Sequence, residues 1–110
     1  MREENLTLEE LKSKLREFLE ERDWLRFSPN EVFIHLIEEL GEISKHLSFL
    51  SEYKTESMGH KKPDDSQMPR EFAQVFFLFM QLCIILDIDI EEAWKEEFKI
   101  MKKRFPTTDT

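Results

Sequence analysis

The feature that most constrains this chain is a central run that is apolar in every direction around a helix. Between residues 72 and 86 the only polar side chains are Gln74 and Gln81. A helix that is apolar on all sides must be covered on all sides, and exposed it would form an aggregation patch. Four helices of one small domain can hardly enclose it, so we expect a second copy to cover part of it, in a homodimer or homotetramer. The run is also too short to span a bilayer.

Capping residues mark where helices begin and end around this run. Thr7-Leu8-Glu9-Glu10 and Ser28-Pro29-Asn30-Glu31 are capping boxes, the second with proline in the first turn. Pro69 can open a third helix, and Asp89 can cap a fourth that stops before Pro106. No stretch has the alternation of a strand. Residues 1–110 are therefore predicted to form one all-α domain, a four-helix bundle.

Two details of this bundle follow from the spacing of apolar residues. Residues 52–68 contain Gly59 and Pro63 and have little periodicity, so they are predicted to form a long loop that is either mobile or functional. In the last helix, Trp94, Phe98 and Met101 recur at helical spacing and are expected to face the other helices.

Carboxylates crowd the second predicted helix. Glu38, Glu39 and Glu42 lie in one short stretch, and Glu39 falls at the edge of the apolar face. Half-buried carboxylates repel one another and usually need a cation, and Mg²⁺ prefers such oxygen ligands. Glu71 and Gln74 are spaced three residues apart and share one face of the third helix. This spacing fits either a metal site or a rim of glutamates paired with Lys and Arg.

Three other residues of the second predicted helix lie close to these carboxylates. His35 and His46 flank the carboxylates, and we expect them to be rim histidines rather than transition-metal ligands. Gly41 costs about 1 kcal/mol of helix propensity, which predicts close approach of another helix or a ligand.

Composition narrows the classes of partner. The 110 residues include 16 Lys and Arg against 24 Asp and Glu, a net charge of −8. This argues against non-specific binding to nucleic acid or to an anionic membrane. It does not exclude nucleotides, because a divalent metal reverses the local charge around phosphates. A single cysteine, Cys83, and a charged N-terminus without an apolar signal segment predict a soluble, cytoplasmic protein.

The order of these motifs resembles a known family. Glu38-Glu39-x-x-Glu42 followed by Glu71-x-x-Gln74 resembles the EExxE…ExxD signature of the MazG-like all-α nucleoside triphosphate pyrophosphohydrolases. Further matching positions, in the same order, are Arg22-Asp23-Trp24, Phe27, Pro29, the turn from Asp87 to Trp94, and Arg104-Phe105-Pro106. The resemblance runs from about Leu8 to Pro106. The Arg-Asp-Trp stretch is most similar to the dCTP pyrophosphatase branch.

The resemblance implies an activity and a set of catalytic residues. The activity is Mg²⁺-dependent hydrolysis of a nucleoside triphosphate to the monophosphate and pyrophosphate, for nucleotide-pool house-cleaning, with Mn²⁺ as an alternative ion. Glu39, Glu42 and Glu71 would bind the metal, and Gln74 stands where the family has a fourth, aspartate ligand. Glu38 would lie in the outer shell or orient water, and a carboxylate would act as general base.

The resemblance also implies residues that contact the substrate. Trp24 and Phe49 fall where the family places aromatic residues around the base, although both also fit ordinary core positions. Lys102 and Arg104, with their basic neighbour Lys103, would contact phosphates, or would simply form a solvated basic helix end.

Two departures from the family pattern leave alternatives open. Gln74 replaces a charged ligand with a weaker neutral one, and Met101 stands where the closing helix usually has an asparagine. The first alternative is a catalytically weakened member of the same fold that binds nucleotides or a partner protein. The second is a structural helical dimer whose glutamates form only a solvated rim.

Overall fold

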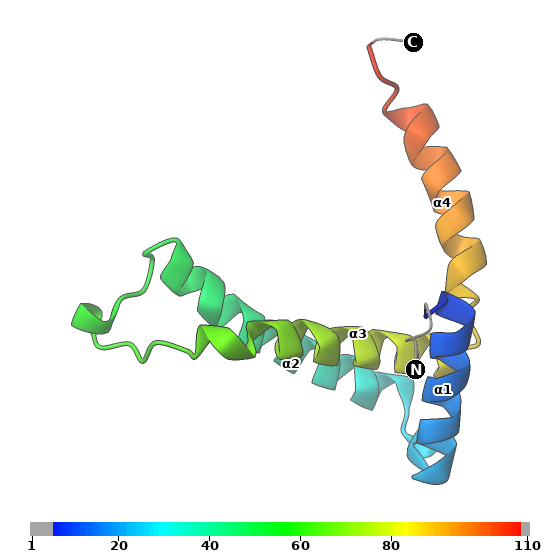
Figure 1. Cartoon of the computed structure of the whole chain (residues 1–110), viewed down its shortest axis with the longest axis horizontal. Helices are drawn as coiled ribbons and strands as arrows, with labels where there is room; N and C mark the ends of the chain where they lie inside the picture. Colours follow the sequence, from blue (N-terminus) through cyan, green and yellow to red (C-terminus); the bar gives the residue numbers. More distant parts are fainter. Residues whose placement is uncertain (1–5, 109–110) are drawn as a thin grey trace, which may run out of the picture.

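The computed structural model describes residues 6–108, and within this range it contains helices and no strands (Figure 1). The four helices are α1 (Leu8–Glu21), α2 (Pro29–Leu50), α3 (Met68–Ile85) and α4 (Ile90–Arg104). Short 3-10 turns lie between them: η1 (Trp24–Arg26), η2 (Glu56–Met58) and η3 (Asp65–Gln67). The all-α class and the number of helices are confirmed.

Local capping chemistry positions the helix starts. The side chains of Thr7, Ser28 and Asp89 each accept a hydrogen bond from the amide three residues later, at 3.1, 3.2 and 3.2 Å. Each bond satisfies one of the amides that a helix leaves unpaired in its first turn. Helix α3 begins at Met68, one residue before Pro69.

Helix α3 is the centre of the packed region. It runs alongside α2, and α1 crosses near its C-terminal end (Figure 1). The buried residues form two clusters: Leu15, Leu19, Met80 and Ile84 between α1 and α3, and Val32, Leu36 and Leu78 between α2 and α3. Phe77 packs against both clusters, so one helix joins the two parts of the core.

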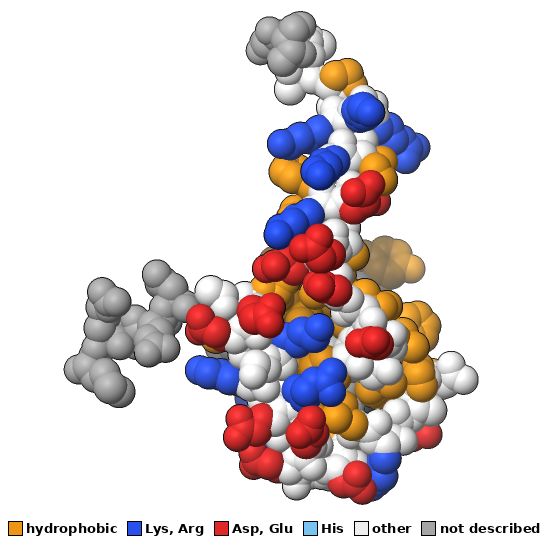
Figure 2. All heavy atoms as spheres, turned by 90° about the vertical axis from the view of Figure 1, so that its right-hand side faces the viewer, with side chains coloured by type: hydrophobic (Ala, Val, Ile, Leu, Met, Phe, Trp, Pro, Cys, Tyr) orange, Lys and Arg blue, Asp and Glu red, His pale blue; other side chains and the backbone are white. Residues whose placement is uncertain are grey.

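Helix α4 extends away from the other three helices (Figures 1 and 2). Its first residue, Ile90, packs against the core cluster of α1 and α3, but no residue of α4 is buried. Trp94, Phe98 and Met101 are exposed, so the expectation that they face the other helices of the same chain is wrong. The rings of Trp94 and Phe98 instead stack on each other, with centroids 5.3 Å apart.

The single chain leaves a large apolar surface uncovered. Its radius of gyration is 18.3 Å, whereas a compact domain of this length has about 13 Å. The exposed large side chains of the two central helices include Phe33, Ile34, Ile37, Leu40 and Leu47 of α2 and Phe72, Phe76 and Phe79 of α3. One side of α3 is therefore covered within the chain and another is not.

The helical stretch Asp65–Ile85, which contains α3, extends beyond the apolar run of residues 72–86 and is long and apolar enough to cross a membrane by length and composition, so the expectation that it is too short is wrong. The core helices of soluble proteins meet the same criterion. In this chain the stretch carries Arg70 and Glu71 and packs against α1 and α2.

A long connection between α2 and α3 was predicted for residues 52–68, and in the structure it comprises residues 51–67. It contains two short 3-10 turns, η2 and η3. The connection lies at the end of the α2–α3 pair that is far from α1 (Figure 1).

Candidate functional site

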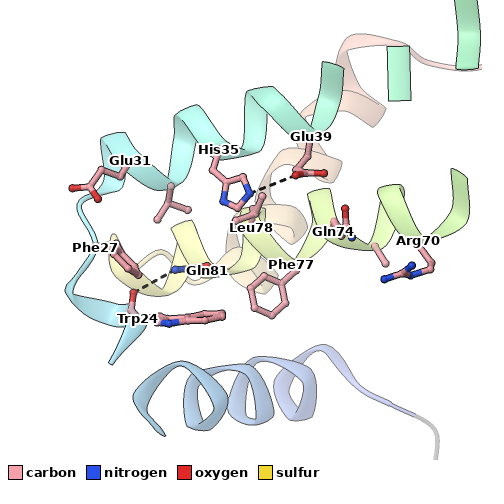
Figure 3. A pocket seen from close by; sticks show the side chains of 12 residues that line it. Trp24, Phe27, Glu31, His35, Glu39, Arg70, Gln74, Phe77, Leu78 and Gln81 are labelled. Atoms are coloured by element: carbon pink, nitrogen blue, oxygen red, sulfur yellow. Dashed lines mark hydrogen bonds and ion pairs between the residues drawn. The ribbon is translucent and has the colours of Figure 1, made fainter. Parts of the chain in front are cut away.

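A cavity of about 840 Å³ lies between η1, α2 and α3 (Figure 3). Aromatic rings gather at one end of it, around Trp24, together with Glu31 and Gln81, and Glu39, Gln74 and Arg70 lie towards the other end. Its volume is in the range of pockets that hold small organic ligands, roughly 300–1,000 Å³.

The aromatic end is held by contacts between segments far apart in the sequence. Asp23 adopts a left-handed conformation, with φ of 57°, which turns the chain after α1 and presents Trp24. The ring of Phe18 meets those of Trp24 and Phe77 edge-on, with centroids 5.7 and 5.9 Å away. Trp24 is 38% exposed, so part of its ring surface is free to stack on a planar ligand.

Gln81 is a buried polar residue at this end of the cavity. Its Nε2 donates a hydrogen bond to the carbonyl oxygen of Trp24, at 3.4 Å. From the sequence, Gln81 is interpreted only as an interruption of an apolar run. Its spacing of seven residues from Gln74 was a usable signal, because residues seven apart share one face of a helix, and both glutamines line the cavity.

The polar end brings together residues from α2 and α3. Glu39, whose side chain is 21% exposed, has its Oε1 3.4 Å from Nε2 of His35, one turn away along α2, a contact that is an ion pair only when the imidazole is protonated. Gln74 and Arg70 approach from α3 (Figure 3). A carboxylate and an amide oxygen suit a hard cation, whereas the guanidinium group suits a phosphate or carboxylate. His35 and Arg70 were not among the predicted site residues.

The other predicted carboxylates lie outside this cavity, and Glu42 and Glu71 have partners of their own. Glu42 forms an ion pair with Lys45 at 3.2 Å, and Glu38 is exposed. Among residues 6–108, no group of three or more His, Cys, Asp or Glu side chains is placed to hold a metal ion. The donor types fit Mg²⁺, but only Glu39 and Gln74 line one cavity, so the complete ligand set stays a prediction.

Glu71 is hydrogen bonded to His46, which we expected from the sequence to be a rim histidine beside the carboxylates. His46 is 1% exposed, and its Nε2 lies 2.6 Å from Glu71 Oε1 while its Nδ1 lies 3.2 Å from Asp65 Oδ1. The hydrogen bond to Asp65 raises the pKa of His46, the contacts with Glu71 raise it further, and burial opposes them. The expected rim position of His46 is therefore wrong.

Three predicted substrate residues also lie outside the cavity in the single chain. Phe49 borders a smaller hollow of about 290 Å³ beside the 51–67 connection. Lys102 and Arg104 lie on the projecting α4, where their side chains cover the rings of Phe98 and Phe105. Trp24, Glu39 and Gln74 line one cavity, but Phe49, Lys102 and Arg104 do not lie at that cavity.

The fold and the cavity define an all-helical protein whose pocket combines aromatic rings with carboxylate, amide and guanidinium groups. No protein-family model and no solved structure matches the chain. A curated relative, human dCTP pyrophosphatase 1, is 24% identical over 101 residues, which cover 91% of this chain and 59% of that protein. The chain thus spans under two thirds of the relative's length. The all-helical structure is compatible with this distant similarity.

Proposed function

We propose that this chain is a nucleoside triphosphate pyrophosphohydrolase that serves nucleotide-pool house-cleaning. The observation that carries the proposal is one cavity with aromatic rings at one end and Glu39, Gln74 and Arg70 at the other. A nucleotide has the same division, with a planar base and a charged phosphate chain. The distant similarity to a dCTP pyrophosphatase over most of the chain supports the same activity.

The residues of the cavity suit separate parts of such a substrate. Trp24, Phe27 and Phe77 would contact the base, because aromatic rings stack on any nucleobase. Arg70 would pair with phosphate oxygens, for which its planar guanidinium group is well suited. Water would attack a phosphorus atom, and cleavage of a phosphoanhydride bond would release pyrophosphate and the nucleoside monophosphate.

Glu39, Glu42, Glu71 and Gln74 would hold Mg²⁺, or Mn²⁺ in its place. When bound, this ion supplies positive charge against the phosphate oxygens and lowers the pKa of water. The cation would compete with Lys45, which contacts Glu42, and would approach Glu71 at the carboxylate oxygen that does not contact His46. Glu38, which is exposed and unpaired among the described residues, would orient the attacking water or accept its proton.

We also propose that the active form is a homodimer or homotetramer. The exposed phenylalanines of α3 and the exposed apolar side chains of α2 form a surface that water does not favour. Helix α4 extends away from its own cavity, so Lys102 and Arg104 would be available to the cavity of a neighbouring copy.

The test is pyrophosphate release from a panel of canonical and modified ribonucleoside and deoxynucleoside triphosphates, with and without Mg²⁺. Glu39→Gln keeps the shape of the side chain and removes its charge, so release should fall about 100-fold or more. Glu96→Gln is the matched control, because Glu96 is an exposed glutamate on α4. Release from no substrate, or equal rates in both variants, would contradict the proposal.

A second candidate is a weakened member of the same fold that binds nucleotides without turnover. The amide of Gln74, which lines the cavity where the family signature has a carboxylate, favours it. Calorimetry would then show nucleotide and Mg²⁺ binding by a wild-type chain that releases no pyrophosphate, and Gln74→Asp would gain turnover. Binding of neither ligand would leave only the structural helical dimer.

A further inference from the structure

A buried imidazole joins three segments at the end of the α2–α3 pair. His46 belongs to the last turns of α2, Asp65 begins η3, and Glu71 lies in the first turn of α3. The side chains of these residues are 1%, 53% and 18% exposed, respectively. The contact therefore reaches from the surface of the 51–67 connection into the helix pair.

The two contacts of His46 lie on opposite sides of one rigid ring. Nδ1 faces Asp65 and Nε2 faces Glu71, so a shift of either carboxylate moves the ring relative to the other. The ring is almost fully enclosed, and close-packed surroundings transmit such shifts instead of absorbing them. Within residues 6–108, the His46–Asp65 pair is the only side-chain hydrogen bond between the 51–67 connection and a side chain of α2.

We propose that His46 is a positioning residue that couples the 51–67 connection to the carboxylate of Glu71. The inference rests on the proposed function, in which Glu71 helps to hold a divalent cation. His46 holds Oε1 of Glu71, and the other oxygen of the same carboxylate has no hydrogen bond among the described residues. A carboxylate oriented in this way by an outer partner is a better-defined metal ligand.

Coupling of this kind acts in both directions. If a cation bound to Glu71 stabilises the contact between Asp65 and His46 by some factor, loss of that contact lowers the affinity for the cation by the same factor. The residue beside His46 in the sequence also contacts a carboxylate of the proposed cation site. Lys45, the residue before His46, forms an ion pair with Glu42, so consecutive residues of α2 contact two of the predicted cation ligands.

The experiment compares variants that keep one contact each. In His46→Gln the side-chain amide can replace Nε2 and keep Glu71, and in His46→Asn it can replace Nδ1 and keep Asp65. Calorimetry with Mg²⁺ alone should show a loss of about 5-fold for His46→Gln, which lacks the Asp65 contact, and a larger loss of about 10-fold or more for His46→Asn, which lacks the Glu71 contact. Circular dichroism checks that both variants keep their helices.

Hydrogen exchange supplies a readout that does not depend on activity. In the wild-type chain, Mg²⁺ should change the exchange rates of amides 64–67, and this response should disappear in both variants of His46. A purely structural histidine would alter exchange equally with and without Mg²⁺, and that result would overturn the proposal.

Two surface variants test the same coupling without touching the buried ring. Asp65→Ala should weaken Mg²⁺ binding about 5-fold or more. Glu56→Ala should leave it unchanged, because Glu56 is an exposed acid of the same connection whose side chain makes no contact with His46. Equal effects of the two variants would show that only charge matters and would overturn the proposal.

The outcomes separate this inference from the proposed function. Mg²⁺ binding that changes exchange at 64–67, without pyrophosphate release from any triphosphate, would support the coupling and contradict the activity. Mg²⁺-dependent release by a chain whose exchange at 64–67 does not respond to Mg²⁺ would support the activity and overturn the coupling. A wild-type chain that binds no Mg²⁺ would overturn the coupling.

Discussion

Substitution of Gly41 by alanine should stabilise the chain. Gly41 lies inside α2 between Glu39 and Glu42, and a Cβ atom at this position would meet nothing within 4 Å. The sequence predicted that another helix or a ligand approaches here, but within one chain the space is open. A helical glycine costs about 1 kcal/mol relative to alanine, so Gly41→Ala should raise the free energy of unfolding by about 1 kcal/mol. The melting temperature should rise by about 4 °C.

Gly59 offers a matched control, because the same methyl group would also meet open space there. Gly59 has a φ of +93°, however, which side chains with a Cβ atom rarely adopt. Gly59→Ala should therefore lower the free energy of unfolding by about 1 kcal/mol. The two substitutions are chemically identical and have opposite predicted signs, so steric space and backbone conformation are tested separately.

Urea unfolding, followed by circular dichroism and extrapolated linearly to water, measures both effects. A decrease in stability for Gly41→Ala would refute the reasoning from open space. If the decrease appeared only at protein concentrations where the chain associates, a second copy would be shown to approach α2 at Gly41.

Three further results are expected. The stability contributed by His46 should be fully present below the ordinary histidine pKa of 6.5 and should be lost as pH rises through its raised folded-state pKa. Urea unfolding between pH 6 and about 9 should therefore show a decline in the wild type that is absent from His46→Gln. Leu19→Ala should cost about 2–5 kcal/mol because Leu19 is fully buried, and a loss under about 1 kcal/mol would contradict its core position. Light scattering after size exclusion should show a dimer or tetramer at micromolar concentration, and a clean monomer would contradict the proposed assembly.

The helices could be predicted from the sequence because their start signals are local. Thr7, Ser28 and Asp89 each bond an amide only three residues away, so the interacting groups are visible in a short stretch of sequence. The predicted helix starts agree with the structure to within about two residues, the range over which helix ends are commonly assigned differently.

The contacts that shape the site could not be predicted, because they join distant residues. Asp65 and Glu71 lie 19 and 25 residues from His46, and Gln81 lies 57 residues from Trp24. A sequence shows which groups are able to form hydrogen bonds but not which distant partners meet them. Glu39 could be found because its position at the edge of an apolar face depends only on helix geometry.

The direction from which α3 covers α2 explains both the cavity and the exposed surface. Leu36 and Ile43 are buried, and so is His46, which lies towards the same side of the helix as Glu39. Leu40 and Leu47 lie on the opposite edge of the apolar face and are exposed, next to Phe33 and Ile37. The apolar residues of α2 therefore form two different surfaces. The surface with Leu36 and Ile43 packs against α3, and the carboxylate edge beside it lines the cavity. The surface with Leu40 and Leu47 is not covered within the chain, which is the arrangement expected if a second copy packs there.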